Sequence, residues 1–236
     1  MTARTTQAAL GAALLGAAAL LAPAGPAAAQ GFEPPPGCTG FLTVQMKGCM
    51  VSNHFTCEGD PEGWKRHVTF REGGASGASV VDDEYQWLES YGTGRSEKLG
   101  LPIEDPASLT ELFETGEDGY DFTVIDTASG EPVSSRIVGV DRLEGSEVEI
   151  DGEPLLRTIF AMRKLDEDGE EELSVTGGQF VSERHRLFFA GTETVEVDGR
   201  TIEVDNTPVR FIEPGEPGFF DARPSFGCDV SDAAFR

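Results

Sequence analysis

The stretch from Tyr120 to Ile212 places the strongest constraint on the fold, because it is a series of short β-type runs separated by turn signals. The clearest hairpin runs from Thr194 to Val204 around Asp198-Gly199. Pairing across that turn puts the apolar side chains on one face and the polar ones on the other. Strands joined by such frequent turns are typical of antiparallel meanders. The sequence therefore predicts a mainly β fold, an antiparallel meander forming a barrel, a half-barrel or a sandwich.

One short helix is predicted near residues 106–114. Asp105 suits the N-cap and Pro106 suits the first helical position, and an apolar stripe of helical spacing follows them. Gly116 can end this helix, which limits it to two or three turns.

The segment before this helix is predicted to contain one long strand, from Val80 to Tyr91. Tyr85, Trp87 and Tyr91 recur there at a period of two residues, which places their side chains on one face. The preceding stretch, residues 73–79, is rich in glycine, alanine and serine and is predicted to be a flexible loop.

The N-terminus has the composition of an export signal. An apolar run covers residues 8–22, and Ala27-Ala28-Ala29 then offers the small side chains that signal peptidase requires. The run is too short and too rich in alanine for a stable membrane anchor, which needs about 20 residues. We expect residues 1–29 to be a signal peptide cleaved after Ala29, residues 30–37 to be a proline-rich leader and residues 38–236 to be a single β-rich domain. The expected location is periplasmic or secreted, with no stable membrane insertion after cleavage.

The four cysteines of the predicted domain favour two disulfides, because an even number of cysteines in an exported chain usually pairs. Zinc is the alternative, but no C-x-x-C pair is present. A two-residue hairpin turn at Lys47-Gly48 would bring Cys38 opposite Cys57. That register leaves Cys49 to pair with Cys228 and tie back the C-terminal tail. A one-residue change of turn would alter the register.

The formal net charge of −24 at pH 7 makes this an acidic chain, which argues against nucleic acid and anionic lipid surfaces as partners, since both would repel it. Basic partners and cations remain compatible with this charge. Acidic side chains spread over a solvated surface are the commonest meaning of such a composition.

No motif for catalysis, metal binding or cofactor binding stands out. The three histidines, His54, His67 and His185, lack metal-ligand spacing and are interpreted as isolated polar positions. The acidic segment 166–172 departs from a calcium loop, because Lys164 and Val175 would occupy its first and twelfth ligand positions. We therefore expect no metal, no cofactor and no identifiable catalytic residue.

Two runs lose the alternation of apolar and polar residues that the other strands show. Both faces are apolar in residues 159–162 and in residues 187–189. Such strands are either covered on both sides or line an apolar cavity. The sequence thus gives four candidate ligand-cavity residues: Phe160, Met162, Phe188 and Phe189.

Three classes of function remain open. The first is a non-enzymatic protein of the cell envelope that binds an apolar small molecule or serves envelope maintenance, with a ligand or an envelope protein as partner. The second is a hydrolase whose site is assembled from scattered residues, and the third is a protein-interaction module. The predicted architecture resembles envelope carrier proteins with curved sheets only in general outline, and a fold alone does not fix a function.

Overall fold

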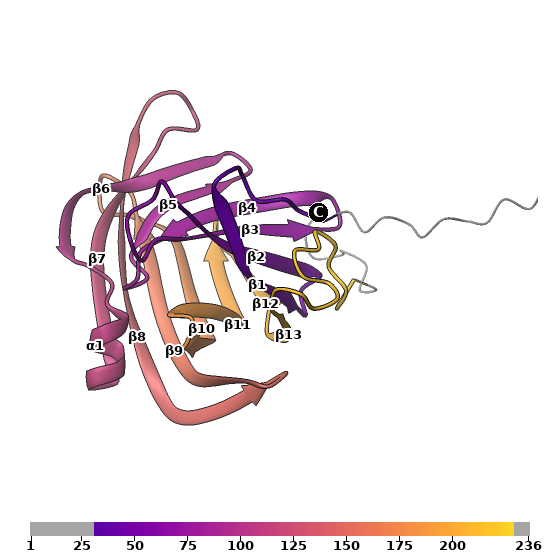
Figure 1. Cartoon of the computed structure of the whole chain (residues 1–236). Coiled ribbons are helices and arrows are strands. Elements are labelled where there is room, and N and C mark those ends of the chain that lie inside the picture. Colours follow the sequence, from indigo (N-terminus) through magenta and orange to yellow (C-terminus); the bar gives the residue numbers. More distant parts are fainter. Residues whose placement is uncertain (1–30, 229–236) are drawn as a thin grey trace, which may run out of the picture.

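In the computed structural model, which describes residues 31–228, the chain forms one antiparallel sheet and one short helix (Figure 1). The helix is α1 (Leu109–Thr115). The strands are β1 (Cys38–Met46), β2 (Met50–Cys57), β3 (Lys65–Arg71), β4 (Gly74–Val81), β5 (Trp87–Gly92), β6 (Arg95–Asp105), β7 (Glu117–Asp126), β8 (Val133–Ile150), β9 (Glu153–Leu165), β10 (Glu171–Ser182), β11 (Leu187–Val197), β12 (Arg200–Asp205) and β13 (Pro208–Ile212).

The sheet is a meander, in which strands that follow one another in the sequence are also neighbours in the sheet. The exception is β13, which returns to pair with β1, so the order is β12-β11-β10-β9-β8-β7-β6-β5-β4-β3-β2-β1-β13. The prediction of a mainly β meander is confirmed. Within the described residues β12 and β13 form the two edges without pairing to each other, so the sheet is not closed into a barrel. The predicted signal peptide and its cleavage after Ala29 lie outside the described residues.

Turn chemistry predicts the Asp198-Gly199 hairpin correctly. Across Asp198-Gly199, Val197 pairs with Arg200 and Val195 pairs with Ile202. Both turn residues have positive φ, 51° and 70°, which is the backbone conformation of the two-residue turn that Asp-Gly favours.

The predicted short helix is present, but it begins later than expected. Its N-cap is Ser108, whose hydroxyl accepts a hydrogen bond from the Glu111 backbone N–H at 3.1 Å, while Asp105 ends β6. Gly116 forms the C-cap at φ 86°, as predicted.

We expect Ser108→Ala to cost about 1 kcal/mol of unfolding free energy, because it removes the acceptor for a backbone N–H at the start of α1. Urea denaturation measures this loss. Ser108→Thr retains the oxygen and is the control, and an equal loss in both variants would show that the cap is not the cause.

The prediction of one strand from Val80 to Tyr91 is wrong, because the chain reverses between β4 and β5. The Asp82 carboxylate accepts hydrogen bonds from the backbone N–H groups of Glu84 and Gln86, each at 2.9 Å, and Tyr85 takes φ 64°. The stretch predicted as a flexible loop instead forms most of β4.

The first hairpin has the expected disulfide but a different turn. Met46 pairs with Met50, so the turn holds three residues instead of the two predicted. An irregularity between Gly40 and Leu42 shifts the register back by one residue, and Cys38 still lies opposite Cys57. The two disulfides are Cys38–Cys57 and Cys49–Cys228. They indicate an oxidising, extracytoplasmic compartment.

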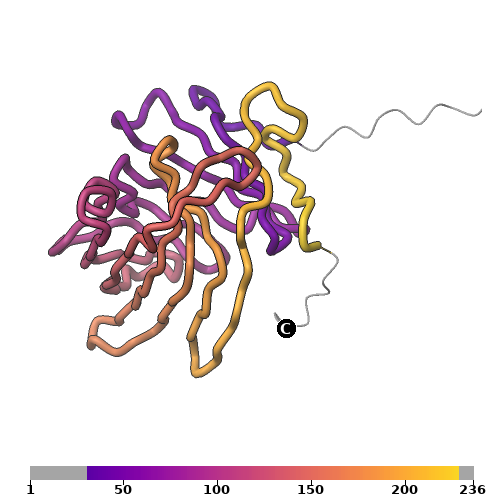
Figure 2. Tube along the Cα trace, turned by 90° about the horizontal axis from the view of Figure 1, so that it is seen from below, coloured from indigo at the N-terminus to yellow at the C-terminus, as the bar shows by residue number. Residues whose placement is uncertain are grey.

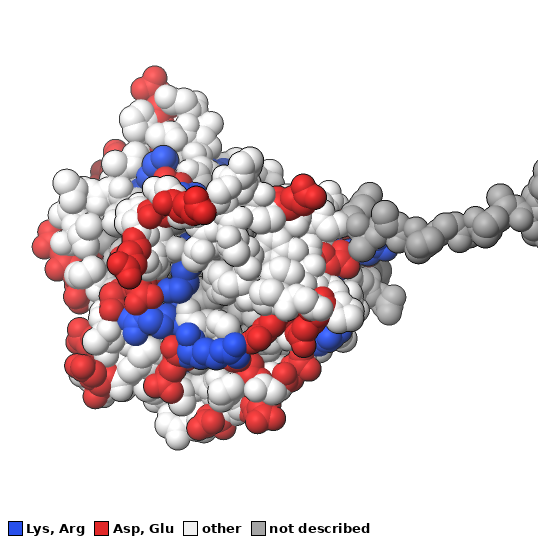
Figure 3. Space-filling view, viewed as in Figure 1, with Lys and Arg blue, Asp and Glu red and all other residues white. Residues whose placement is uncertain are grey.

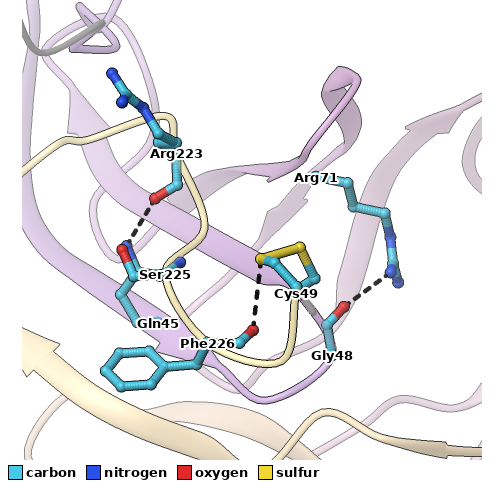
Figure 4. Close-up of a disulfide and its surroundings, with 8 residues drawn as sticks. Gln45, Gly48, Cys49, Arg71, Arg223, Ser225 and Phe226 are labelled. Carbon is cyan, nitrogen blue, oxygen red and sulfur yellow. Dashed lines mark hydrogen bonds between the residues drawn. A yellow bond between two sulfur atoms is a disulfide. The ribbon is translucent and has the colours of Figure 1, made fainter. Parts of the chain in front are cut away.

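The C-terminal segment, residues 213–228, lies against β1 and β2, beside the N-terminal strands (Figure 2). Buried polar side chains of these strands hold its backbone. Thr43 Oγ1 accepts from Phe220 N at 2.8 Å, Asn53 Nδ2 donates to Asp221 O at 3.0 Å, and Gln45 bonds Arg223 O and Ser225 N. Figure 4 shows the Cys49–Cys228 disulfide, in which Cys228 Sγ lies 3.8 Å from Phe226 O. The same carbonyl oxygen accepts from Cys49 N at 3.0 Å.

Phe32, in the predicted leader, also packs against the C-terminal segment and the neighbouring strands. Phe32 donates its backbone N–H to Phe220 O at 2.7 Å, and its ring lies 5.7 Å from the Phe220 ring and 5.3 Å from the Phe70 ring. The main core lies on the other side of β1, where Leu42 and Val44 pack with Phe189 and Phe211. No helix among residues 31–228 is long and apolar enough to span a membrane.

Candidate ligand-binding cavity

The curvature of the sheet brings β3–β6 opposite β8–β11, and these strands line a partly open cavity of about 550 Å³, here called the large chamber. Its walls are mostly the inward-facing side chains of these strands. They include Val80, Val81, Trp87, Ile137, Met162, Leu173, Val175, Phe188, Ala190 and Val195. A volume of this size is typical of small-molecule sites.

A second space of about 60 Å³, the small chamber, adjoins the large one near α1. Five side chains line both: Tyr85, Trp87, Met162, Gln179 and Phe188. The small chamber is completed by Glu84, Ala107, Asp118, Tyr120, Phe122, Asp141 and Phe160. The two chambers therefore form one elongated site with a roomy apolar part and a narrow, acidic end.

The structure places three of the four candidate cavity residues on these walls. Phe160 lines the small chamber, and Met162 and Phe188 line both. Phe189 lies on the opposite face of β11, where its ring packs edge-on against Phe211 at 5.1 Å in the main core. Within residues 187–189, Phe188 thus faces the chambers, whereas Leu187 and Phe189 face the main core. Ile159, by contrast, points outward and is 46% exposed.

Charged groups in the large chamber are mostly paired. Glu97 accepts a hydrogen bond from Lys164 Nζ at 2.9 Å, and Glu89 lies 3.1 Å from Lys98 Nζ. Glu193 differs, since no hydrogen bond or ion pair to its carboxylate is found within residues 31–228, and burial raises its pKa. The large chamber is therefore close to neutral apart from one carboxyl group.

The small chamber contains two buried carboxyl groups without a cationic partner in the described part of the chain. Asp118, on β7, is 4% exposed; its Oδ2 accepts from Ser108 N at 3.0 Å, while Oδ1 has no partner. Asp141, on β8, is 6% exposed and accepts from Gln179 Nε2 at 2.5 Å. Burial is the largest cause that raises the pKa of Asp118 to about 6 and that of Asp141 to about 7.

Glu84, the third acidic group of the small chamber, is fully engaged in the structure. Its carboxylate accepts from Thr110 N at 2.8 Å and from Ser108 Oγ at 3.2 Å, and Arg186 Nη2 lies 2.8 Å away. These contacts lower its pKa despite partial burial. Glu84 therefore fastens α1 to the β4–β5 turn, whereas Asp118 and Asp141 remain available.

Comparison with protein-family models, curated proteins and solved structures found no match for this chain.

The histidines are not isolated, which corrects the interpretation drawn from their spacing. His54 and His67 are cross-strand neighbours with ring centroids 5.2 Å apart, and Phe41 packs on both His54 and His185. Burial lowers the pKa of His54 and takes that of His67 to about 4, so both rings are neutral at pH 7. Of the three, His67 contributes to a chamber wall.

Side chains of metal-ligand type come close together at one place within residues 31–228, where Cys49 and Cys228 lie near Glu72. Both sulfur atoms belong to a disulfide, so this group offers no thiolate.

Sequence reasoning missed Asp118 and Asp141, although a signal for both exists. Asp118, Tyr120 and Phe122 alternate along β7 at a period of two, so Asp118 lies on the same inward face as the two aromatic residues. Asp141 continues the inward face of β8 beyond Ile137 in the same way. A carboxylate that extends an apolar stripe is conspicuous only once the strand boundaries are known.

Proposed function

We propose that this protein is a non-enzymatic, periplasmic binding protein that holds a largely apolar small molecule in the large chamber. The observation that carries the proposal is a cavity of about 550 Å³ with aromatic and aliphatic walls, inside a sheet that is otherwise well packed. The two disulfides and the apolar N-terminal segment that ends in Ala27-Ala28-Ala29 support the periplasmic location.

The walls suit a ligand with a slender apolar body. Trp87 packs edge-on against Phe122 at 5.8 Å, and Tyr85 packs edge-on against Phe188 at 5.0 Å, so the rings that separate the two chambers support one another. Such rings offer a large apolar contact area at little cost in side-chain entropy.

A hydrolase is less well supported by the geometry. Ser52 Oγ lies 3.0 Å from His54 Nε2, but both residues are buried and neither lines a chamber. Ser182 Oγ, which donates to Glu153 at 2.8 Å, is also fully buried. A nucleophile must reach its substrate, and these hydroxyl groups have no route to one.

Filling the cavity tests the proposal. We expect the wild type to bind the neutral fluorescent probe N-phenyl-1-naphthylamine, and Ala190→Trp to weaken this binding by about tenfold or more, because the indole would occupy the large chamber. Fluorescence titration measures the affinity. Ala161→Trp adds the same ring to the exposed face of β9 and is the matched control. Equal binding by all three proteins, or no binding by the wild type, would contradict the proposal.

A further inference from the structure

We propose that the ligand of this cavity carries an alkylammonium group, a protonated amine, which docks in the small chamber between Asp118 and Asp141 with its apolar chain in the large chamber. This inference rests on the proposed function, since it assigns the chemistry of the ligand's polar end. Four features of the small chamber carry it.

The first feature is negative charge that the protein leaves uncompensated. The charged groups that act on Asp118 are themselves acidic, namely Glu111, Asp105 and Glu84, and the one that acts on Asp141 is Asp118. A buried carboxyl group ordinarily has a cationic partner or several hydrogen-bond donors. Here Asp118 Oδ1 is buried without any partner in residues 31–228, and Asp118 is one of the residues that line the small chamber.

The second feature is the aromatic wall around these carboxyl groups. Trp87, Tyr120, Phe160 and Phe188 line the same small space. The faces of aromatic rings carry negative charge density and attract cations, and this attraction is strongest when the cation has left water. An ammonium group therefore finds both kinds of partner that it prefers.

The third feature is the size and donor set of the chamber, which favour an organic cation over a metal ion. Calcium takes six to eight oxygen ligands. The carboxylates of the small chamber do not gather three ligand oxygens within 4.8 Å of one another in the described part of the chain. A space of about 60 Å³ with apolar walls accommodates an ammonium group and its adjoining methylene instead.

The fourth feature is continuity with the large chamber. Tyr85, Trp87, Met162, Gln179 and Phe188 line both spaces, so a chain attached to the ammonium group can pass directly between apolar side chains. Glu193, the unpaired carboxyl group of the large chamber, adds further negative potential along this path. An anionic end group would be repelled by the carboxyl groups of the small chamber.

The test compares three probes with the same eight-carbon chain: octylamine, 1-octanol and sodium octanoate. Isothermal titration calorimetry at pH 8 and 150 mM salt is expected to give about tenfold tighter binding for octylamine than for 1-octanol, with octanoate weakest. In the double variant Asp118→Asn/Asp141→Asn, octylamine affinity should fall to that of 1-octanol, while 1-octanol affinity should stay unchanged. Each single Asn variant should show part of this loss.

The control is Glu114→Gln/Glu131→Gln, which removes the same two charges from exposed positions. This variant should keep the preference for octylamine. Loss of the preference in both double variants, or retention in both, would show that the acidic surface as a whole attracts the amine and would overturn the inference. Equal affinity of the wild type for octylamine and 1-octanol would overturn the inference and leave the proposed function standing. No binding of any of these probes or of N-phenyl-1-naphthylamine would overturn both.

Discussion

At pH 8, Asp141→Asn is expected to raise the unfolding free energy of the ligand-free protein by up to about 4 kcal/mol. Burial, followed by the negative charge of Asp118, raises the pKa of Asp141 from its ordinary value of 3.8 to about 7, and the hydrogen bond from Gln179 offsets only part of this. The folded protein therefore opposes ionisation of this carboxyl group, and Asn has the same shape without the charge. The amide oxygen can still accept the Gln179 hydrogen bond.

The sign of the effect follows from the raised pKa. The protonated carboxyl group favours the folded state most fully below pH 3.8, and this contribution is lost as the pH rises through about 7. The advantage of Asn over Asp should accordingly be largest at pH 8 and vanish near pH 4. Urea denaturation at pH 4, 6 and 8 measures it.

Asp198→Asn is the matched control, because Asp198 is exposed in a hairpin turn that asparagine also favours. It removes one unit of negative charge from a chain of net charge −24 without touching the cavity. An equal gain in both variants would attribute the effect to overall charge. A loss of stability in Asp141→Asn at pH 8 would show that the ionised group has a favourable partner in the folded protein.

The presence of a carboxyl group that lowers stability and lines a cavity is most simply explained by a role in binding a ligand. Proteins commonly give up stability at functional sites, where charged or strained groups wait for a ligand. The acidic side chains on the molecular surface cost little stability, because water solvates them (Figure 3). Asp118 and Asp141 differ from them, because water is largely excluded from these two carboxyl groups.

The parts of the fold that depend on nearby residues could be predicted from the sequence. The Asp198-Gly199 hairpin and the end of α1 at Gly116 follow from backbone conformations that the turn residues favour. The register predicted for the first hairpin is wrong by one residue at the turn. The irregularity after Gly40 shifts the pairing by one residue in the opposite direction, so the predicted Cys38–Cys57 pair is nevertheless correct. The start of α1 was misplaced because both Asp105 and Ser108 have N-cap chemistry, and Asp105 is taken up by β6.

The parts that depend on distant residues could not be predicted in this way. Thr43, Gln45 and Asn53 are polar yet buried, because the backbone that satisfies them belongs to residues 220–225 at the other end of the chain. Asp118 and Asp141 are two of 42 acidic residues, and they come together because they lie opposite each other on the paired strands β7 and β8, a register that the sequence analysis does not predict. Composition and periodicity contain no information on which strands face each other across a cavity.

Removal of the Cys49–Cys228 disulfide, as Cys49→Ser/Cys228→Ser, is expected to lower the unfolding free energy by about 5 kcal/mol. The bond joins residues 179 positions apart, and the entropy that a cross-link removes from the unfolded chain increases with the length of the loop it closes. Cys38→Ser/Cys57→Ser is the matched comparison. That bond joins strands that already pair and spans 19 positions, for which the same relation gives about 3 kcal/mol.

The larger loss has a structural cause as well. Without its covalent link, the C-terminal segment is held to β1 and β2 by Phe220, Asp221 and the backbone bonds to Gln45, and each departure of the segment exposes polar groups that it covers. Hydrogen exchange should therefore rise first at the amides of residues 220–226 in the Cys49→Ser/Cys228→Ser protein, while the hairpin at Asp198-Gly199 stays unaffected. Probe binding in the large chamber should also persist, since neither sulfur atom lines it. A smaller loss of stability than in the Cys38→Ser/Cys57→Ser protein would mean that the non-covalent contacts alone hold the segment in place.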